Sequence, residues 1–221
     1  MKYLTDPQAF LGLMNQFWMG LGVTVPLFFY TLVFSLPLGV AVALLRMSRW
    51  RPVAFATRVY ILVLRGTPLI LQIFAIYFLL PQIVGRSMDR MFSAALAFVL
   101  NYAAYFAEIF RGGLESVPRG QKEAGKMLGM SRAQVFFRIL LPQMCKRCLL
   151  PVSNEVVTLV KDTALVTAIA LCDMYYYAKR ATSASGSLLP LFIAGAFYLI
   201  MNTAVEVAFN RLNRRLDYYR G

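Results

Sequence analysis

Histidine is absent from this 221-residue sequence, and cysteine occurs only three times. The lack of histidine removes the most common general base of enzymes. Cys145 and Cys148 have a C-x-x-C spacing, but no second pair and no histidine complete a zinc site. We therefore interpret this spacing, at the start of a hydrophobic helix, as apolar packing or chance. A Gly-rich phosphate loop and a nucleophile–base pair are also missing, so any nucleotide hydrolysis would require another polypeptide.

Acidic residues are scarce as well, with 10 Asp and Glu against 23 Lys and Arg, which gives a net charge of +13. A charge of this size can indicate a nucleic-acid-binding protein. However, 59% of the residues are hydrophobic, against about half in an average soluble domain. The apolar residues lie in long blocks, and basic residues gather on the cytoplasmic loops of membrane proteins. The composition therefore predicts a polytopic membrane protein with no nucleic-acid partner.

Five apolar blocks predict an all-α fold with five transmembrane helices, because a span needs roughly 20 residues. The blocks are Phe17–Leu45, Val53–Pro81, Met91–Phe110, Cys148–Cys172 and Leu188–Phe209. Pro26 and Pro37 lie inside the first block, which is long enough to tilt, kink or extend beyond the bilayer. The segment Gly66-Thr67-Pro68 predicts a break in the second block. We expect residues 1–221 to form a single transmembrane domain.

The distribution of basic residues predicts the orientation of these spans. With the N-terminus outside, the inner segments hold 16 Lys and Arg and the outer segments hold five. The reverse orientation would invert this threefold bias, against the positive-inside rule. We therefore expect the N-terminus to lie outside and the C-terminus to be cytoplasmic.

The longest connection between the blocks, at about residues 112–146, is predicted to be a cytoplasmic helical hairpin. Its first helix spans Gln121–Leu128 and stops at Gly129, since glycine suits the left-handed residue after a helix end. Its second helix begins at Ser131, and Gln134 three residues later completes a capping box. The apolar face of this second helix consists of Val135, Phe136, Ile139 and Leu140, and Pro142 follows. A surface of this kind indicates a soluble partner or the membrane surface.

Several ionisable residues fall inside the predicted spans, where they are costly and usually functional. They are Arg65, Glu108, Glu155, Lys161, Asp162 and Glu206. A simpler interpretation remains open for some of them. Glu108 has a pairing partner three residues later in Arg111, and Lys161 and Asp162 have the alternative of neutralising each other.

Two segments place helix breakers or polar groups where the backbone would otherwise meet lipid. They are Arg65–Pro68 and Asn154–Thr163. Irregular backbone at this depth is tolerated only beside protein or a water-filled cavity. We expect a cavity that suits a small polar solute, lined by Gln72, Asn154, Thr158 and Thr163. The alternative is that the proline kinks serve packing alone.

Four motifs in register across residues 60–170 resemble the permease subunits of bacterial ABC importers. Glu123-Ala124-Gly125, followed by Gly129, Ile139 and Leu141-Pro142, is similar to the cytoplasmic "EAA" signature of that family. The other three motifs resemble the polar-amino-acid subfamily: Arg65–Pro68 with Gln72, Glu108–Gln121, and Asn154-Glu155 with Lys161–Leu165. The sequence departs from the family pattern at Gly125, where Ala is usual, and at Ala164, where Ser is common.

This resemblance implies a non-catalytic permease subunit of an ATP-driven importer for a polar L-amino acid, located in the bacterial plasma (inner) membrane. The implied partners are an ABC ATPase dimer that binds ATP and Mg, a second permease copy or paralogue, and an extracytoplasmic amino-acid-binding protein. The residues expected to couple to the ATPase are Gln121, Glu123, Ala124, Gly125, Leu128, Gly129, Ser131, Val135, Phe136 and Ile139. The residues expected along the substrate pathway are Arg65, Thr67, Pro68, Gln72, Asn101, Tyr102, Glu108, Asn154, Glu155, Thr158, Lys161, Asp162 and Thr163.

Two other classes of function remain as alternatives. A small oligomeric secondary transporter or channel would also use intramembrane charges, but such proteins often contain inverted repeats, and we find no convincing repeat here. A membrane-embedded enzyme is disfavoured by the lack of histidine and of clustered carboxylates. Glu155 and Asp162 would suit a cationic amino acid, yet both belong to the family-like motif, so glutamine, glutamate and cystine remain open as substrates.

Overall fold

A computed structural model describes residues 3 and 6–215, and every regular element within them is a helix. The first of these, α2 (Pro7–Arg46), is 40 residues long. Asp6 caps it by accepting hydrogen bonds from the backbone N–H groups of Gln8 and Ala9, which would otherwise lack partners. The helix remains continuous through Pro26 and Pro37 and extends beyond the predicted span at its N-terminal end.

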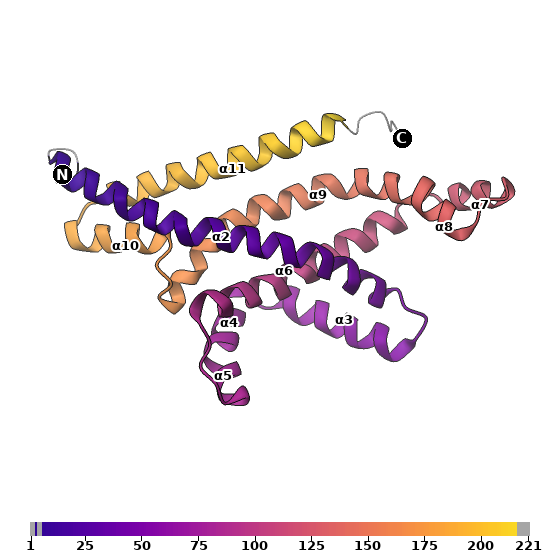
Figure 1. Cartoon of the computed structure of the whole chain (residues 1–221), viewed down its shortest axis with the longest axis horizontal. Helices are drawn as coiled ribbons and strands as arrows, with labels where there is room; N and C mark the ends of the chain where they lie inside the picture. Colours follow the sequence, from indigo (N-terminus) through magenta and orange to yellow (C-terminus); the bar gives the residue numbers. More distant parts are fainter. Residues whose placement is uncertain (1–2, 4–5, 216–221) are drawn as a thin grey trace.

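The second apolar block is divided at the predicted position. Helix α3 (Arg51–Gly66) ends there, and α4 (Leu69–Phe74), the π-helical turn η1 (Ala75–Leu79) and α5 (Leu80–Val84) follow. The axes on the two sides of the break differ by 110°, and Figure 1 shows α4 and α5 turned away from the long axis of the molecule. The proline at 68 cannot continue α3, because it lacks the N–H group that the helix requires.

Two long helices form the centre of the fold with α2. Helix α6 (Arg90–Glu115) packs along α2, and α9 (Leu141–Asp162) lies beside α6 (Figure 1). Their facing side chains form the main hydrophobic core, which includes Phe98, Phe106 and Leu159, each fully buried. The core thus holds α6 and α9 side by side. The predicted pathway residues of the two helices lie along the same contact.

The predicted hairpin follows α6. Helix α7 (Arg119–Met127) ends before Gly129, which has a φ of 72°, in the left-handed region that favours glycine. Both bonds of the predicted capping box are present at the start of α8 (Arg132–Val135): the Gln134 N–H donates to the Ser131 hydroxyl at 3.2 Å, and the Ser131 N–H donates to the Gln134 side chain at 2.8 Å.

The second hairpin helix continues directly into the fourth apolar block, which the sequence had placed as a separate helix from Cys148. Helix α8 passes through the π-helical turn η2 (Phe136–Leu140) into α9, and Pro142 lies in the first turn of α9. A proline ring clashes with the carbonyl four residues earlier in an α-helix, and the wider π turn relieves that clash. The same arrangement occurs at η1, directly before Pro81. The hairpin therefore continues into α9 without a break in the helical backbone.

The remainder of the fourth block is not α-helical. The 3₁₀-helix η3 (Thr163–Ile169) follows α9, and α10 (Met174–Ser185), which the sequence analysis did not predict, packs on α2. Helix α11 (Leu189–Arg215) then runs beside α9. In Figure 1, α10 and the N-terminal end of α2 lie at one end of the long axis, and α7, α8 and the α2–α3 connection lie at the other.

Within the described residues, three helices are long and apolar enough to cross a membrane: α2, α6 and α11. The bent pair formed by α3 and α4–α5 is a fourth candidate, either as a broken span or as a re-entrant loop. Helix α9 does not qualify, although most of the predicted fourth span lies in it, because its polar residues lower its hydropathy. Three of its polar residues, Glu155, Thr158 and Asp162, face the cavity described below.

Candidate functional site

A polar cavity of about 400 Å³ lies between the α3–α4 break and helices α6 and α9. Thr67 and Pro68 line it from the break, Asn101, Tyr102 and Tyr105 from α6, and Glu155, Thr158 and Asp162 from α9; Leu69 and Leu165 complete the wall. Positions 155, 158 and 162 have the spacing of one helix face. This space, which we call the polar cavity, contains most of the predicted pathway residues.

Side-chain amides stabilise the break that forms one wall of the cavity. The Gln72 amide donates to the Leu64 carbonyl at 2.9 Å and to the carbonyl and hydroxyl of Thr67 at 3.1 and 2.9 Å. The Asn101 amide donates to the same Leu64 carbonyl and to the Gln72 side-chain oxygen, both at 2.9 Å. The last carbonyls of a helix have no intrahelical partner, so these two amides satisfy groups that the break would leave exposed.

The acidic side of the cavity is formed by α9. The Tyr102 hydroxyl donates to an Asp162 carboxylate oxygen at 2.7 Å. Glu155, about two turns earlier, is half-buried on the same face, and the structure gives no ion pair for either carboxylate within the described residues. Both carboxylates are therefore available to a cationic or hydrogen-bond-donating solute.

A second cavity, of about 490 Å³, shares the walls of Tyr105 and Glu155 with the first and adds Arg65 and Glu108. It extends along α6 toward Ser116, where the Arg147 guanidinium donates to the Ser116 carbonyl. The two cavities form a polar route from the centre of the fold toward the hairpin end of the molecule.

Tyr105 is the residue that the sequence analysis missed. It lines both cavities and a third one beside Arg65, and its ring centroid lies 5.0 Å from the Arg65 guanidinium carbon. This distance suits a cation–π contact. Its position four residues after Asn101 and three before Glu108 places it on the same face of α6, and this spacing was the available signal.

The simpler interpretation of Glu108 is confirmed by its contacts. Arg111 pairs with Glu108 at 2.7 Å and with Glu115 at 2.5 Å. Glu108 also lines the second cavity. Its ion pair with Arg111 therefore lies at the edge of the polar route.

Six predicted pathway residues do not line the polar cavity, which corrects our expected lining. Arg65 and Glu108 line the second cavity instead, and the other four are Gln72, Asn154, Lys161 and Thr163. The Gln72 amide is committed to the broken backbone, and the fully buried Thr163 hydroxyl donates to the Val160 carbonyl at 2.7 Å. Asn154 and Lys161 are exposed at the edge of the cavity-facing side of α9. Thr158 alone of the four originally expected cavity residues lies in the wall.

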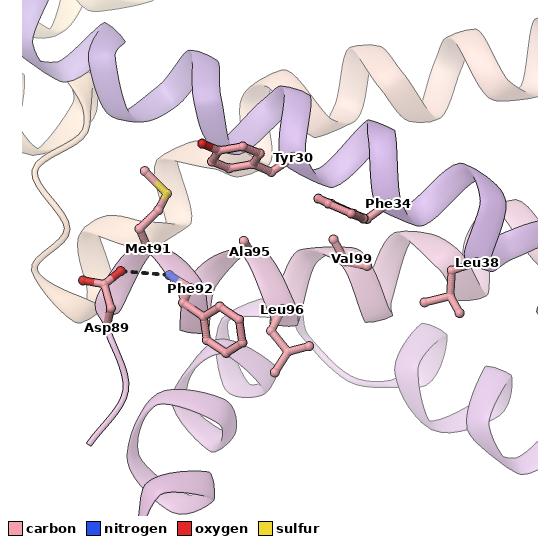
Figure 2. A pocket seen from close by; sticks show the side chains of 9 residues that line it. All are labelled: Tyr30, Phe34, Leu38, Asp89, Met91, Phe92, Ala95, Leu96 and Val99. Atoms are coloured by element: carbon pink, nitrogen blue, oxygen red, sulfur yellow. Dashed lines mark hydrogen bonds between the residues drawn. The ribbon is translucent and has the colours of Figure 1, made fainter. Parts of the chain in front are cut away.

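A larger hollow of about 640 Å³ between α2 and α6 has a different character (Figure 2). Phe34, Leu38 and Val99 are among its lining side chains, and Asp89 at its end is engaged in capping α6 through the Phe92 N–H at 3.0 Å. Its apolar wall offers nothing to orient a polar solute.

In the hairpin, the expected coupling residues divide into an exposed group and a packed group. Gln121, Glu123, Ala124, Leu128, Gly129 and Ser131 are exposed, Phe136 and Ile139 are half-buried, and Gly125 and Val135 are buried. Met127 and Leu128 are 88% and 79% exposed, which is unusual for large apolar side chains and is typical of a surface that a partner covers.

Residues 35–218 match the model of a protein family described as "Binding-protein-dependent transport system inner membrane component". This match covers most of the chain. The chain belongs to this family. Members are permease subunits of ABC transporters, and the resemblance of the four motifs to that family is confirmed.

Individual relatives of this permease are similar over most of their lengths. The L-cystine transport system permease protein TcyB of Bacillus subtilis is 36% identical over 202 residues, 90% of this chain and 86% of the relative. The arginine transport system permease protein ArtQ of the same organism is 36% identical over 198 residues, 89% of this chain and 90% of the relative. The octopine transport system permease protein OccM of Rhizobium radiobacter is 41% identical over 201 residues, 85% of this chain and 82% of the relative.

Solved structures agree with the family assignment. A crystal structure of an amino acid ABC transporter with histidines matches with a TM-score of 0.86 and 31% identity, covering 96% of this permease and 99% of that chain. The MetNI methionine ABC transporter in an inward-facing conformation matches with a TM-score of 0.72 at 20% identity, which supports the fold alone. This protein is thus a membrane-embedded permease of the ABC importer family.

Proposed function

We propose that this permease moves a polar L-amino acid through the polar cavity toward the cytoplasm. The observation that carries the proposal is the presence of opposite charges along the polar route. Arg65 lies on one side of it, and Glu155 and Asp162 lie on the other. An amino acid presents both a carboxylate and an ammonium group, so such a route stabilises both ends of the zwitterion after its hydration shell is removed.

The substrate class follows from the same charges and from the relatives. The names of the relatives specify cystine, arginine and octopine, all of which are polar amino acids or derivatives of them. We expect uptake of at least one polar amino acid when this permease is reconstituted with its ATPase and candidate binding proteins. Accumulation of other small solutes, with no uptake across a panel of amino acids, would contradict the proposal.

We propose five membrane crossings, with the N-terminus outside and the hairpin and C-terminus in the cytoplasm. Three helices and one bent pair are candidates by length and hydropathy, and α9 is the fifth because its polar face is turned to the cavity and away from lipid. The 16 basic residues assigned to the inner segments support this orientation. Exposed Cys145 provides a marker: in intact cells it should resist a membrane-impermeant thiol reagent, and it should react after permeabilisation.

We further propose that the hairpin couples the cavity to a separate ABC ATPase dimer, which binds ATP and Mg. The continuous helical connection from α8 through η2 to α9 would transmit a movement of the hairpin to Glu155 and Asp162. A second permease copy or paralogue would complete the pathway, and an extracytoplasmic binding protein would deliver the amino acid to its outer mouth.

Glu123→Arg tests the coupling role directly. Glu123 is exposed on α7, so the substitution should leave the fold intact and release the ATPase or uncouple its hydrolysis from uptake. Co-purification in mild detergent and the ratio of ATP hydrolysed to amino acid imported are the measurements, with Arg211→Glu, exposed near the C-terminal end of α11, as the charge-reversal control. Normal assembly and transport in Glu123→Arg would refute this role.

A further inference from the structure

A basic pocket of about 870 Å³ lies between the hairpin and the α2–α3 connection, outside the polar route. Five cationic side chains line it: Arg49, Arg119, Lys122, Lys126 and Arg132. Arg49 belongs to the connection after α2, whereas the other four belong to α7 and α8. The fold therefore brings positive charges from two distant parts of the sequence around one space.

The described residues do not neutralise the charge of this basic pocket. Among them Glu115 is the one carboxylate in its wall, and it pairs with Arg111 at 2.5 Å. Among residues 3 and 6–215, no ion pair joins a carboxylate to any of the five cations. Like charges around a confined space create a positive potential that attracts an anion.

The floor of the pocket identifies the kind of anion. Leu114, Val117, Val135, Phe136 and Leu140 also line it, and Val117 and Val135 are buried. An inorganic anion gains nothing from an apolar floor. A phospholipid presents a phosphate beside glycerol esters and acyl chains, so it would use both the cations and the floor.

The position of Arg49 favours the same ligand. The connection from Met47 to Trp50 joins two apolar helices, and Trp50 is 68% exposed. Tryptophan is enriched at the membrane–water interface, which places Arg49 at the level of the lipid phosphates. This step rests on the orientation proposed above, in which the hairpin is cytoplasmic.

The basic pocket occupies one face of α7, and part of the expected ATPase surface lies on the other. Arg119, Lys122 and Lys126 have the i, i+3, i+7 spacing of one helix face. Gln121, Ala124 and Leu128 lie on the opposite face and are exposed, whereas Val135 and Phe136 of the expected coupling set belong to the pocket floor. A ligand in the pocket therefore leaves the opposite face of α7 free for the ATPase.

From these observations we propose that the basic pocket binds the phosphate headgroup of an anionic phospholipid in the inner leaflet. The bound lipid ties the hairpin to the membrane surface at the α2–α3 connection, while the opposite face of α7 engages the ATPase. Coupling between ATP hydrolysis and transport then depends on the anionic lipid content of the membrane.

The first test measures lipid retention by the purified permease–ATPase complex, using phosphatidylglycerol as the probe and native mass spectrometry as the readout. The variant is Arg49→Gln/Lys122→Gln/Lys126→Gln. The control, Arg138→Gln/Arg211→Gln/Arg214→Gln, removes the same charge from exposed positions outside the pocket. We expect about tenfold to about a hundredfold weaker retention in the variant, since each cation near an anionic surface contributes about fivefold, and little change in the control. Equal retention by both would overturn the proposal.

A second arm separates the lipid from a soluble phosphate. Inorganic phosphate and glycerol 3-phosphate, added in large excess, should fail to displace phosphatidylglycerol, because neither can use the apolar floor. Displacement of the lipid by either one would assign the pocket to a soluble phosphate and overturn the lipid assignment.

The third arm measures transport in phosphatidylcholine vesicles with and without phosphatidylglycerol. Phosphatidylglycerol should raise amino-acid uptake per ATP hydrolysed several-fold in the unmodified complex and leave the pocket variant unchanged. Equal stimulation of the unmodified complex and the pocket variant would contradict the proposal that the bound lipid ties the hairpin to the membrane surface. Because retention is measured without transport, a complex that binds the lipid but imports no amino acid would refute the proposed function and leave the pocket assignment standing.

Discussion

The hairpin and the polar cavity are assembled over very different distances along the chain. The hairpin is determined by neighbours: Ser131 and Gln134 cap each other, and Gly129 supplies the left-handed turn. The cavity joins the α3–α4 break to α6 and α9, which lie roughly 35 and 90 residues further along the sequence. A substitution in the hairpin should therefore alter the stability of the hairpin alone, whereas a substitution in the cavity wall should affect all three elements that form it.

The largest effect on stability is expected at Asn101, which connects α6 to the break. Asn101→Leu removes two hydrogen bonds and leaves the partly buried Leu64 carbonyl and Gln72 side-chain oxygen without one partner each, at about 1–3 kcal/mol for each group. We expect the free energy of unfolding in detergent to fall by about 3 kcal/mol. Thermal unfolding checks this, and Asn154→Leu, at an exposed position of α9, is the control. Equal losses in the two variants would show that the break does not depend on α6.

The next effect is expected at the Tyr102–Asp162 contact inside the polar cavity. Tyr102→Phe keeps the buried ring but removes the donor to the carboxylate, a charged hydrogen bond of about 1.5–3 kcal/mol. Uptake should fall roughly tenfold while assembly with the ATPase is retained. A double-mutant cycle with Asp162→Asn measures the coupling between the two side chains, and strict additivity would show that the bond plays no part in transport.

A smaller and strictly local effect is expected at the hairpin cap. Ser131→Ala removes the acceptor for the Gln134 N–H, which costs about 1 kcal/mol at a helix N-terminus. Hydrogen exchange should increase in α8 and remain unchanged around the polar cavity, with Ser183→Ala on the exposed surface of α10 as the control. Increased exchange at the α3–α4 break would disprove the local character of the hairpin.

The smallest effect is expected at Gly125, where the family usually has alanine. A Cβ at this position would lie 2.9 Å from the Ile139 Cδ1 and Val135 Cγ2 atoms, and both are terminal methyl groups that can shift. The gain of about 1 kcal/mol in helix propensity offsets this crowding, so Gly125→Ala should change the melting temperature by less than about 2 °C. A large loss of stability would show that the hairpin packs more rigidly than its sequence suggests.

The sequence predicted the local features well because each depends on a few adjacent residues. The break at Gly66-Thr67-Pro68, the end of α7 at Gly129 and the capping box at Ser131 all occur as expected. The continuity of the hairpin with α9 through Pro142 was missed, because proline usually ends a helix, whereas here a π turn directly before it lets the helix continue. Helix α10 was missed as well, since its short, mixed sequence lacks a clear period.

Composition and pattern alone determined that this protein is an all-helical membrane protein with a basic hairpin, since hydropathy and charge are properties of each residue, and the permease assignment came from the resemblance of its motifs to a known family. Which polar groups face one another was decided only by the tertiary structure. Gln72 and Asn101 were expected in the solute pathway, yet both hydrogen-bond the broken backbone, and Tyr105, which was not expected at all, lines three cavities. A backbone carbonyl exposed by a break must find a donor within hydrogen-bond distance, and helix packing decides which side chain can reach it.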